Sequence, residues 1–77
     1  MSNPYVLSIE TTEGVSHQHG YHYGTDLALA MQLTEGAFAA RIIHGLPTVT
    51  MALKRGGKVE HVYYGKGQWD DYTGVGV

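Results

Sequence analysis

The feature that most constrains the fold of this chain is one long helical segment, Thr25 to Pro47, with a signal at each end. At its start, the Thr25 hydroxyl can accept a hydrogen bond from a first-turn N–H, and Asp26 places negative charge at the positive end of the helix dipole. At its end, Gly45 can adopt a positive φ and Pro47 cannot continue a helix. We therefore expect a helix with Thr25 as its N-cap, which either runs through Gly36 or splits there into two shorter helices.

The expected helix is apolar on two sides. One sector carries mostly large side chains and is the expected core-facing stripe: Leu27, Met31, Phe38 and Ile42. A second sector carries mostly small ones: Leu29, Ala30, Leu33, Gly36, Ala37 and Ala40. A helix with two apolar sides needs two neighbours, and a small chain offers one sheet. We therefore expect the second sector to form an interface with another copy of the chain. The alternative is that the N-terminal hairpin or the C-terminal tail covers it.

Alternating apolar and polar residues predict strands on both sides of the helix. Residues 5–12 read as a half-buried strand, and residues 15–23 can return as a second strand after a Glu13-Gly14 turn. After the helix, residues 48–53 and 59–64 flank Gly56-Gly57, a pair typical of a two-residue hairpin turn.

This turn sets an expected register for the C-terminal hairpin. With the two glycines as the loop, Arg55 faces Lys58 and Met51 faces Val62. The side chains expected to face the helix are then Val49, Met51, Leu53, Val62 and Tyr64. Those expected on the opposite face are Thr50, Ala52, His61 and Tyr63.

These elements predict an α+β fold in a single domain, residues 1–77. A small antiparallel sheet, made of an N-terminal strand or hairpin and a C-terminal hairpin, packs on one long helix in the order β(β)αββ. Residues 65–77 are glycine-rich and are expected to form a partly irregular tail. A chain of this size buries only about 60% of the surface that its unfolded form exposes, so oligomerisation or a metal would help to stabilise it. The absence of cysteine excludes disulfides and thiolate metal sites.

Three neighbouring histidines, His17, His19 and His22, are candidate metal ligands. On a regular strand the first two lie on one face, and His22 joins them only if Gly20 kinks the chain. A divalent metal such as zinc, or a small ligand, is the alternative to an exposed polar hairpin that happens to be rich in histidine. No other cofactor is expected.

A second cluster combines basic side chains with an aromatic one: Lys54, Arg55, Lys58, Lys66 and Tyr63. Such residues can neutralise phosphates and stack on bases, which predicts weak binding of single-stranded nucleic acid. However, the net charge is −2, and lysines near a hairpin turn also discourage edge pairing. Nucleic acid is therefore the less favoured partner.

The sequence carries none of the familiar catalytic signatures. It has no Cys nucleophile, no Gly-x-Ser-x-Gly elbow, no phosphate-binding Gly-rich loop and no His-Glu-x-x-His helix. No apolar run reaches the length of a membrane span, and the first residues do not resemble a secretory signal. We therefore expect a non-catalytic, cytoplasmic interaction module that forms a homodimer or binds another protein, without a membrane partner.

Overall fold

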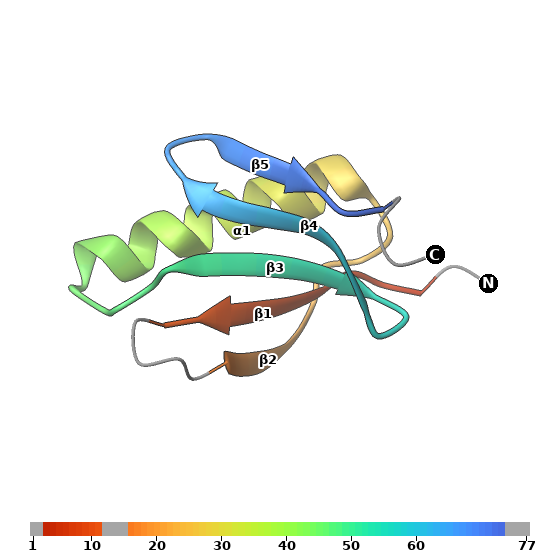
Figure 1. The fold of residues 1–77 in the computed structure, drawn as a ribbon, viewed down its shortest axis with the longest axis horizontal. Coiled ribbons are helices and arrows are strands. Elements are labelled where there is room, and N and C mark those ends of the chain that lie inside the picture. The colour runs from red at the N-terminus through yellow and green to blue at the C-terminus, as the bar shows by residue number, and fades with distance from the viewer. Residues whose placement is uncertain (1–2, 12–15, 74–77) are drawn as a thin grey trace.

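The structure is a computed structural model that describes residues 3–11 and 16–73, with residues 16–22 described by their backbone alone. In chain order the elements are β1 (Val6–Glu10), β2 (Ser16–His22), α1 (Leu27–Ile43), β3 (Thr50–Arg55), β4 (Lys58–Gly65) and β5 (Gln68–Asp71). The strands form one antiparallel sheet in the order β2-β1-β3-β4-β5, and α1 packs on one face of it (Figure 1). This arrangement confirms the predicted α+β fold.

The first turn of α1 is capped by Asp26, whereas the prediction assigned this role to Thr25. The Asp26 carboxylate accepts hydrogen bonds from the backbone N–H groups of Ala28 at 3.0 Å and Leu29 at 3.4 Å. Both residue types are good N-caps, but a carboxylate also interacts favourably with the positive end of the helix dipole. The helix therefore begins one residue later than expected.

The far end of α1 matches the predicted stop. Gly45 has a φ of +68°, and the backbone N–H of Leu46 donates to the carbonyl of Arg41 at 2.9 Å. This pattern is a Schellman motif, which satisfies carbonyls that the last turn leaves unpaired. Gly36 does not divide the helix, since α1 is continuous through it.

The β3–β4 hairpin has the predicted turn but a different register. The loop residues 56–57 both have positive φ, as expected. Farther from the turn, Met51 faces Tyr63, whereas the prediction paired it with Val62. The difference arises because Glu60 has no partner on β3 and forms a β-bulge.

The bulge reverses the predicted faces of β4. Side chains of a strand alternate between its two faces, so a shift of one residue moves each of them to the other face. His61 and Tyr63, which were predicted on the outer face, are buried. Val62 and Tyr64, which were predicted to face the helix, are more exposed and line a hollow on the outer face of the sheet.

The helix meets the sheet through small side chains. Ala30 and Thr34 are fully buried, whereas Ile42, which was predicted to face the core, is 56% exposed. Large side chains of the sheet occupy the space beneath the helix, so small helix residues face them and the helix approaches closely. The other members of the predicted stripe pack against the core while partly buried: Leu27, Met31 and Phe38.

A fifth strand lies within the segment that was predicted as a glycine-rich tail. It follows a two-residue turn at Lys66-Gly67, where both residues have positive φ. The Trp69 ring on β5 lies 4.8 Å from that of Tyr63, measured between centroids, and its Nε1–H donates to Glu35 at 2.9 Å. These contacts attach β5 to both β4 and α1.

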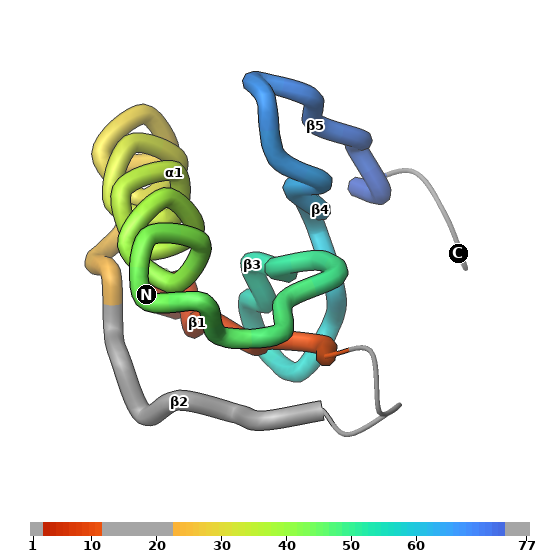
Figure 2. The backbone as a smooth tube through the Cα atoms, turned by 90° about the vertical axis from the view of Figure 1, so that its left-hand side faces the viewer, coloured from red at the N-terminus to blue at the C-terminus, as the bar shows by residue number. Residues whose placement is uncertain are grey.

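The hydrophobic core lies between α1 and one face of the sheet. Figure 2 shows β4 and β5 rising alongside the helix, so that the sheet curves around it. The buried apolar side chains come from α1, from β1, β3 and β4, and from Tyr5, which directly precedes β1. They are Tyr5, Leu7, Ile9, Ala30, Met51, Leu53 and Tyr63. Within residues 3–11 and 16–73, no helix is long and apolar enough to cross a membrane.

Candidate functional site

The residues of α1 that were predicted to form an interface divide into two groups. Ala30 is fully buried and Ala37 packs against the core, so both contribute to the fold of a single chain. A Cβ added to Gly36 would meet no atom within 4 Å, so the space beside this residue is open. The members of the second group are all exposed: Leu29, Leu33, Gly36 and Ala40.

Together with Ile43, these exposed residues form a continuous strip, which we name the α1 seam: Leu29, Leu33, Gly36, Ala40 and Ile43. They follow one another at intervals of four, three, four and three residues. This is the spacing of contact residues where two helices pack as a coiled coil. The three large side chains are substantially exposed, at 48% for Leu29, 43% for Leu33 and 81% for Ile43.

A groove of about 550 Å³ lies between the C-terminal half of α1 and the end of β4. Most of its lining is apolar: Phe38, Ala39, Ile42, Ile43, Tyr63 and Tyr64. Two charged residues, Glu35 and Lys66, also line it. By their helical positions, Glu35 and Ala39 lie on a different side of α1 from the seam. The volume is in the range of small-molecule binding sites.

Aromatic packing fixes one wall of this groove. The Phe38 ring meets that of Tyr63 edge-on, with centroids 5.2 Å apart, and the Tyr63 hydroxyl accepts a hydrogen bond from the Gly67 N–H at 3.0 Å. Gly65 allows this packing because a Cβ there would lie 2.7 Å from the Phe38 ring. The wall is therefore preformed.

A second hollow of about 500 Å³ lies on the face of the sheet that faces away from α1. The Tyr64 and Tyr72 hydroxyls are 3.3 Å apart there. Hydrogen bonds with Tyr72 and then with Asp70 raise the pKa of Tyr64 above its ordinary value, so its phenol loses its proton only at a higher pH than an ordinary tyrosine does. The lining of this hollow also includes the polar residues Glu10 and Thr50, which are hydrogen-bonded to each other.

The predicted histidine cluster lies on a strand that the structure describes by its backbone alone. His17, His19 and His22 belong to β2, and their side chains lie outside the described residues. The metal or small-ligand site therefore stays a prediction. In the part of the chain whose side chains are described, no group of three or more His, Asp or Glu residues is placed to hold a metal ion.

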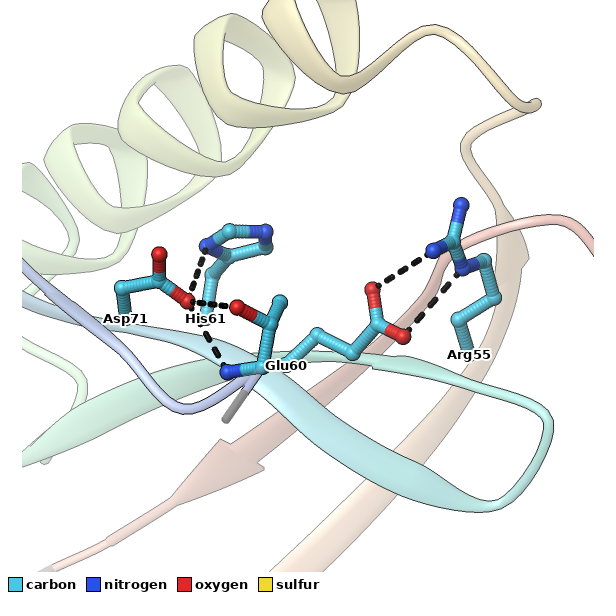
Figure 3. Close-up of polar contacts among 5 residues, drawn as sticks. Arg55, Glu60, His61 and Asp71 are labelled. Atoms are coloured by element: carbon cyan, nitrogen blue, oxygen red, sulfur yellow. Dashed lines mark hydrogen bonds and ion pairs between the residues drawn. The ribbon is translucent and has the colours of Figure 1, made fainter. Parts of the chain in front are cut away.

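Arg55, one of the predicted nucleic-acid residues, is held by contacts within the chain. Its Nη2 lies 3.1 Å from Oε1 of Glu60, and its Nε donates to Oε2 at 3.3 Å (Figure 3). The guanidinium also lies 5.0 Å from the ring centre of Tyr5, a cation–π distance. Oε1 of Glu60 is buried without a hydrogen bond, and the positive charge of Arg55 compensates for the burial of this negatively charged oxygen.

The other residues of this cluster do not form one surface. Lys54 and Lys58 lie near the Gly56-Gly57 turn, whereas Lys66 lies beyond the opposite end of β4. The length of β4 separates the two ends by roughly 25 Å. Tyr63 is part of the core and has no exposed ring face on which a base could stack.

His61 and Asp71 form a polar pair across β4 and β5, with Nδ1 and Oδ1 4.0 Å apart (Figure 3). Asp71 accepts hydrogen bonds from the hydroxyl of Thr73 at 2.7 Å and from its backbone N–H at 2.9 Å. These two bonds hold the pKa of Asp71 below its ordinary value, and the nearby His61 acts in the same direction. The pair joins the end of β5 to β4, which is a structural role.

The groove was not predicted from the sequence because the β4–β5 turn was not predicted. Tyr63 and Tyr64 precede Lys66-Gly67 and Trp69 follows it, which is the pattern of two strands joined by a two-residue turn. Lysine is rare where φ is positive, so the turn signal was weak. The groove also depends on the register of β4, which the bulge changed.

The chain matches no protein-family model, no curated protein and no solved structure.

Proposed function

We propose that this chain is a non-catalytic interaction module that forms a homodimer through the α1 seam and acts in the cytoplasm. The distribution of exposed apolar side chains supports this proposal. Of the eight large ones among the described residues, six lie on α1 and the loop after it, namely Leu29, Leu33, Ile42, Ile43, Leu46 and Val49. Three of these six belong to the seam: Leu29, Leu33 and Ile43. Clustered apolar surface of this kind marks interaction sites. The cysteine-free composition fits a reducing compartment.

A second copy of α1 fits the seam in antiparallel orientation, about a two-fold axis at Gly36. In that arrangement Leu29 lies beside Ile43 of the second copy, and Leu33 lies near its Ala40. Large side chains thus meet small or complementary ones, and the two Gly36 positions let the helices approach closely. The opposed helix dipoles are also favourable. A two-fold interface requires one surface that is complementary to itself, and the proposed pairing of Leu29 with Ile43 would supply it.

The size of the seam sets the expected strength of association. A standard interface covers about 800 Å² on each partner, roughly a sixth of the 4982 Å² that this chain exposes. The seam contributes three large side chains per copy, which is few for a tight complex. We therefore expect a dissociation constant of about micromolar order.

Site-specific oxidation tests this arrangement directly, because the chain has no cysteine of its own. In a Gly36→Cys variant the two thiols lie at the symmetry axis, so mild oxidation is expected to give a covalent dimer in high yield. Ala28→Cys is the matched control, since Ala28 is exposed on the same helix. Its two copies would be about 24 Å apart along the helix axes, too far for a disulfide. Equal cross-linking of the two variants would contradict the proposed pairing.

A further inference from the structure

We propose that the groove between α1 and β4 is a binding site for a single-chain amphiphile with an anionic head group, such as a medium-chain carboxylate. This site is separate from self-association. Its helix side is formed by residues such as Ala39 and Ile42, whereas the seam follows Leu29, Leu33 and Gly36; Ile43 alone belongs to both.

The apolar body of such a ligand matches the lining of the groove. Phe38, Ile42 and Tyr63 are apolar or aromatic, and the groove holds about 550 Å³. Sites for small molecules have this volume and this composition, with a few polar groups that fix the orientation of the ligand. Because the wall of Phe38 and Tyr63 is already packed, little ordering is needed on binding.

The charges at the groove favour an anionic head group. Lys66 is its single cationic lining residue, and within the described residues it makes no ion pair. The other charged lining residue, Glu35, keeps its negative charge, and a hydrogen bond from the indole N–H of Trp69 holds its carboxylate in place. An incoming carboxylate would meet an exposed ammonium group that makes no ion pair within the described chain, and this positive charge favours an anionic head group over a neutral or cationic one.

The backbone at Lys66 gives an independent indication. Lys66 has a φ of +55° and is the single residue other than glycine with positive φ in the described chain. The turn at residues 56–57 uses glycine at the equivalent position, where it causes no strain. A lysine in this conformation costs stability, and such exceptions to local preference gather at functional sites.

Binding can be measured with the wild-type protein and three ten-carbon probes: decanoate, decanol and decyltrimethylammonium. The probes share an apolar chain and differ in charge. Calorimetry gives affinity and stoichiometry, and Trp69, the one tryptophan of the chain, reports binding by fluorescence because it contacts the groove wall. We expect one decanoate per chain, bound roughly tenfold more tightly than decanol. The cationic probe should bind most weakly.

Two pairs of variants test the roles of charge and space. Lys66→Gly is expected to weaken decanoate binding about tenfold and to leave decanol binding unchanged. Its melting temperature should be unchanged or higher, since glycine relieves the strain of the positive φ. Lys58→Ala removes the same charge at the distant turn and should have no effect. Ala39→Phe fills the groove and should abolish binding of both probes, whereas Ala28→Phe, also exposed on α1, should not.

Several results would overturn this proposal. One is the absence of saturable decanoate binding to the folded wild-type protein. Another is an unchanged preference for decanoate over decanol in Lys66→Gly. A third is an equal effect of Ala39→Phe and Ala28→Phe on binding. If Ala39→Phe instead halves the particle mass and decanoate does not bind, the groove is covered by a second copy of the chain. The cross-linking of Gly36→Cys does not depend on any of these outcomes, so the two proposals can fail separately.

Discussion

Replacing Leu33 with glutamate is expected to convert the dimer into a monomer without unfolding the chain. Leu33 lies in the seam and is 43% exposed, so the change adds charge without opening the core of one chain. Glutamate is also a good helix former. In the dimer, however, the substitution places two carboxylates about 9 Å apart along the helix axes in an apolar contact. Burial of unpaired charge should weaken association at least a hundredfold, about 2.7 kcal/mol.

The control for this prediction is Gln32→Glu, which adds the same charge at the neighbouring exposed position outside the seam. Particle mass and circular dichroism should be measured for both variants at one concentration. Leu33→Glu should be monomeric and helical, and Gln32→Glu should keep the wild-type mass. If both variants keep that mass, the seam is not the interface. Ala37 is unsuitable for this test because it packs against the core.

Replacing Leu53 with alanine is expected to cost about 3 kcal/mol of the free energy of unfolding. Leu53 is fully buried on β3 between the sheet and α1, so its loss leaves a cavity that the surrounding side chains cannot fill. In a domain of this size, 1 kcal/mol lowers the melting temperature by about 4–8 °C, so we expect a fall of roughly 12–24 °C. Because small domains are only marginally stable, this change removes a large fraction of the total.

Leu46→Ala is the matched control, since it deletes the same atoms from a side chain that is 45% exposed after α1. We expect it to cost under about 1 kcal/mol. Chemical denaturation monitored by circular dichroism provides both values. Equal losses for the two variants would show that Leu53 does not lie in the core.

The sequence predicted those features that depend on local chemistry. The stop of α1 at Gly45 and the turn at Gly56-Gly57 follow from backbone conformations that glycine adopts readily, and both are present. The N-cap was missed by one residue because Thr25 and Asp26 are both good caps. Local signals therefore located the elements but left their ends uncertain by a residue.

The faces of the elements were harder to predict because they depend on contacts between segments distant in the sequence. The bulge at Glu60 could not be read from alternation alone, and it exchanged the inner and outer faces of β4. Likewise, Ile42 was predicted to face the core from its position on the helix, but large side chains of the sheet favour Ala30 and Thr34 there. The groove could not be predicted for both reasons, since Tyr63 and Ile42 line it.

The absolute mass of the wild-type protein in solution gives the sharpest test of self-association through α1. Light scattering during size exclusion, at about 100 μM and with chelator present, separates this association from any that depends on metal. A dimer through α1 has twice the chain mass of 8.4 kDa, and we expect this mass to fall toward that of the single chain on dilution below the dissociation constant. A mass of 8.4 kDa at every concentration would contradict it.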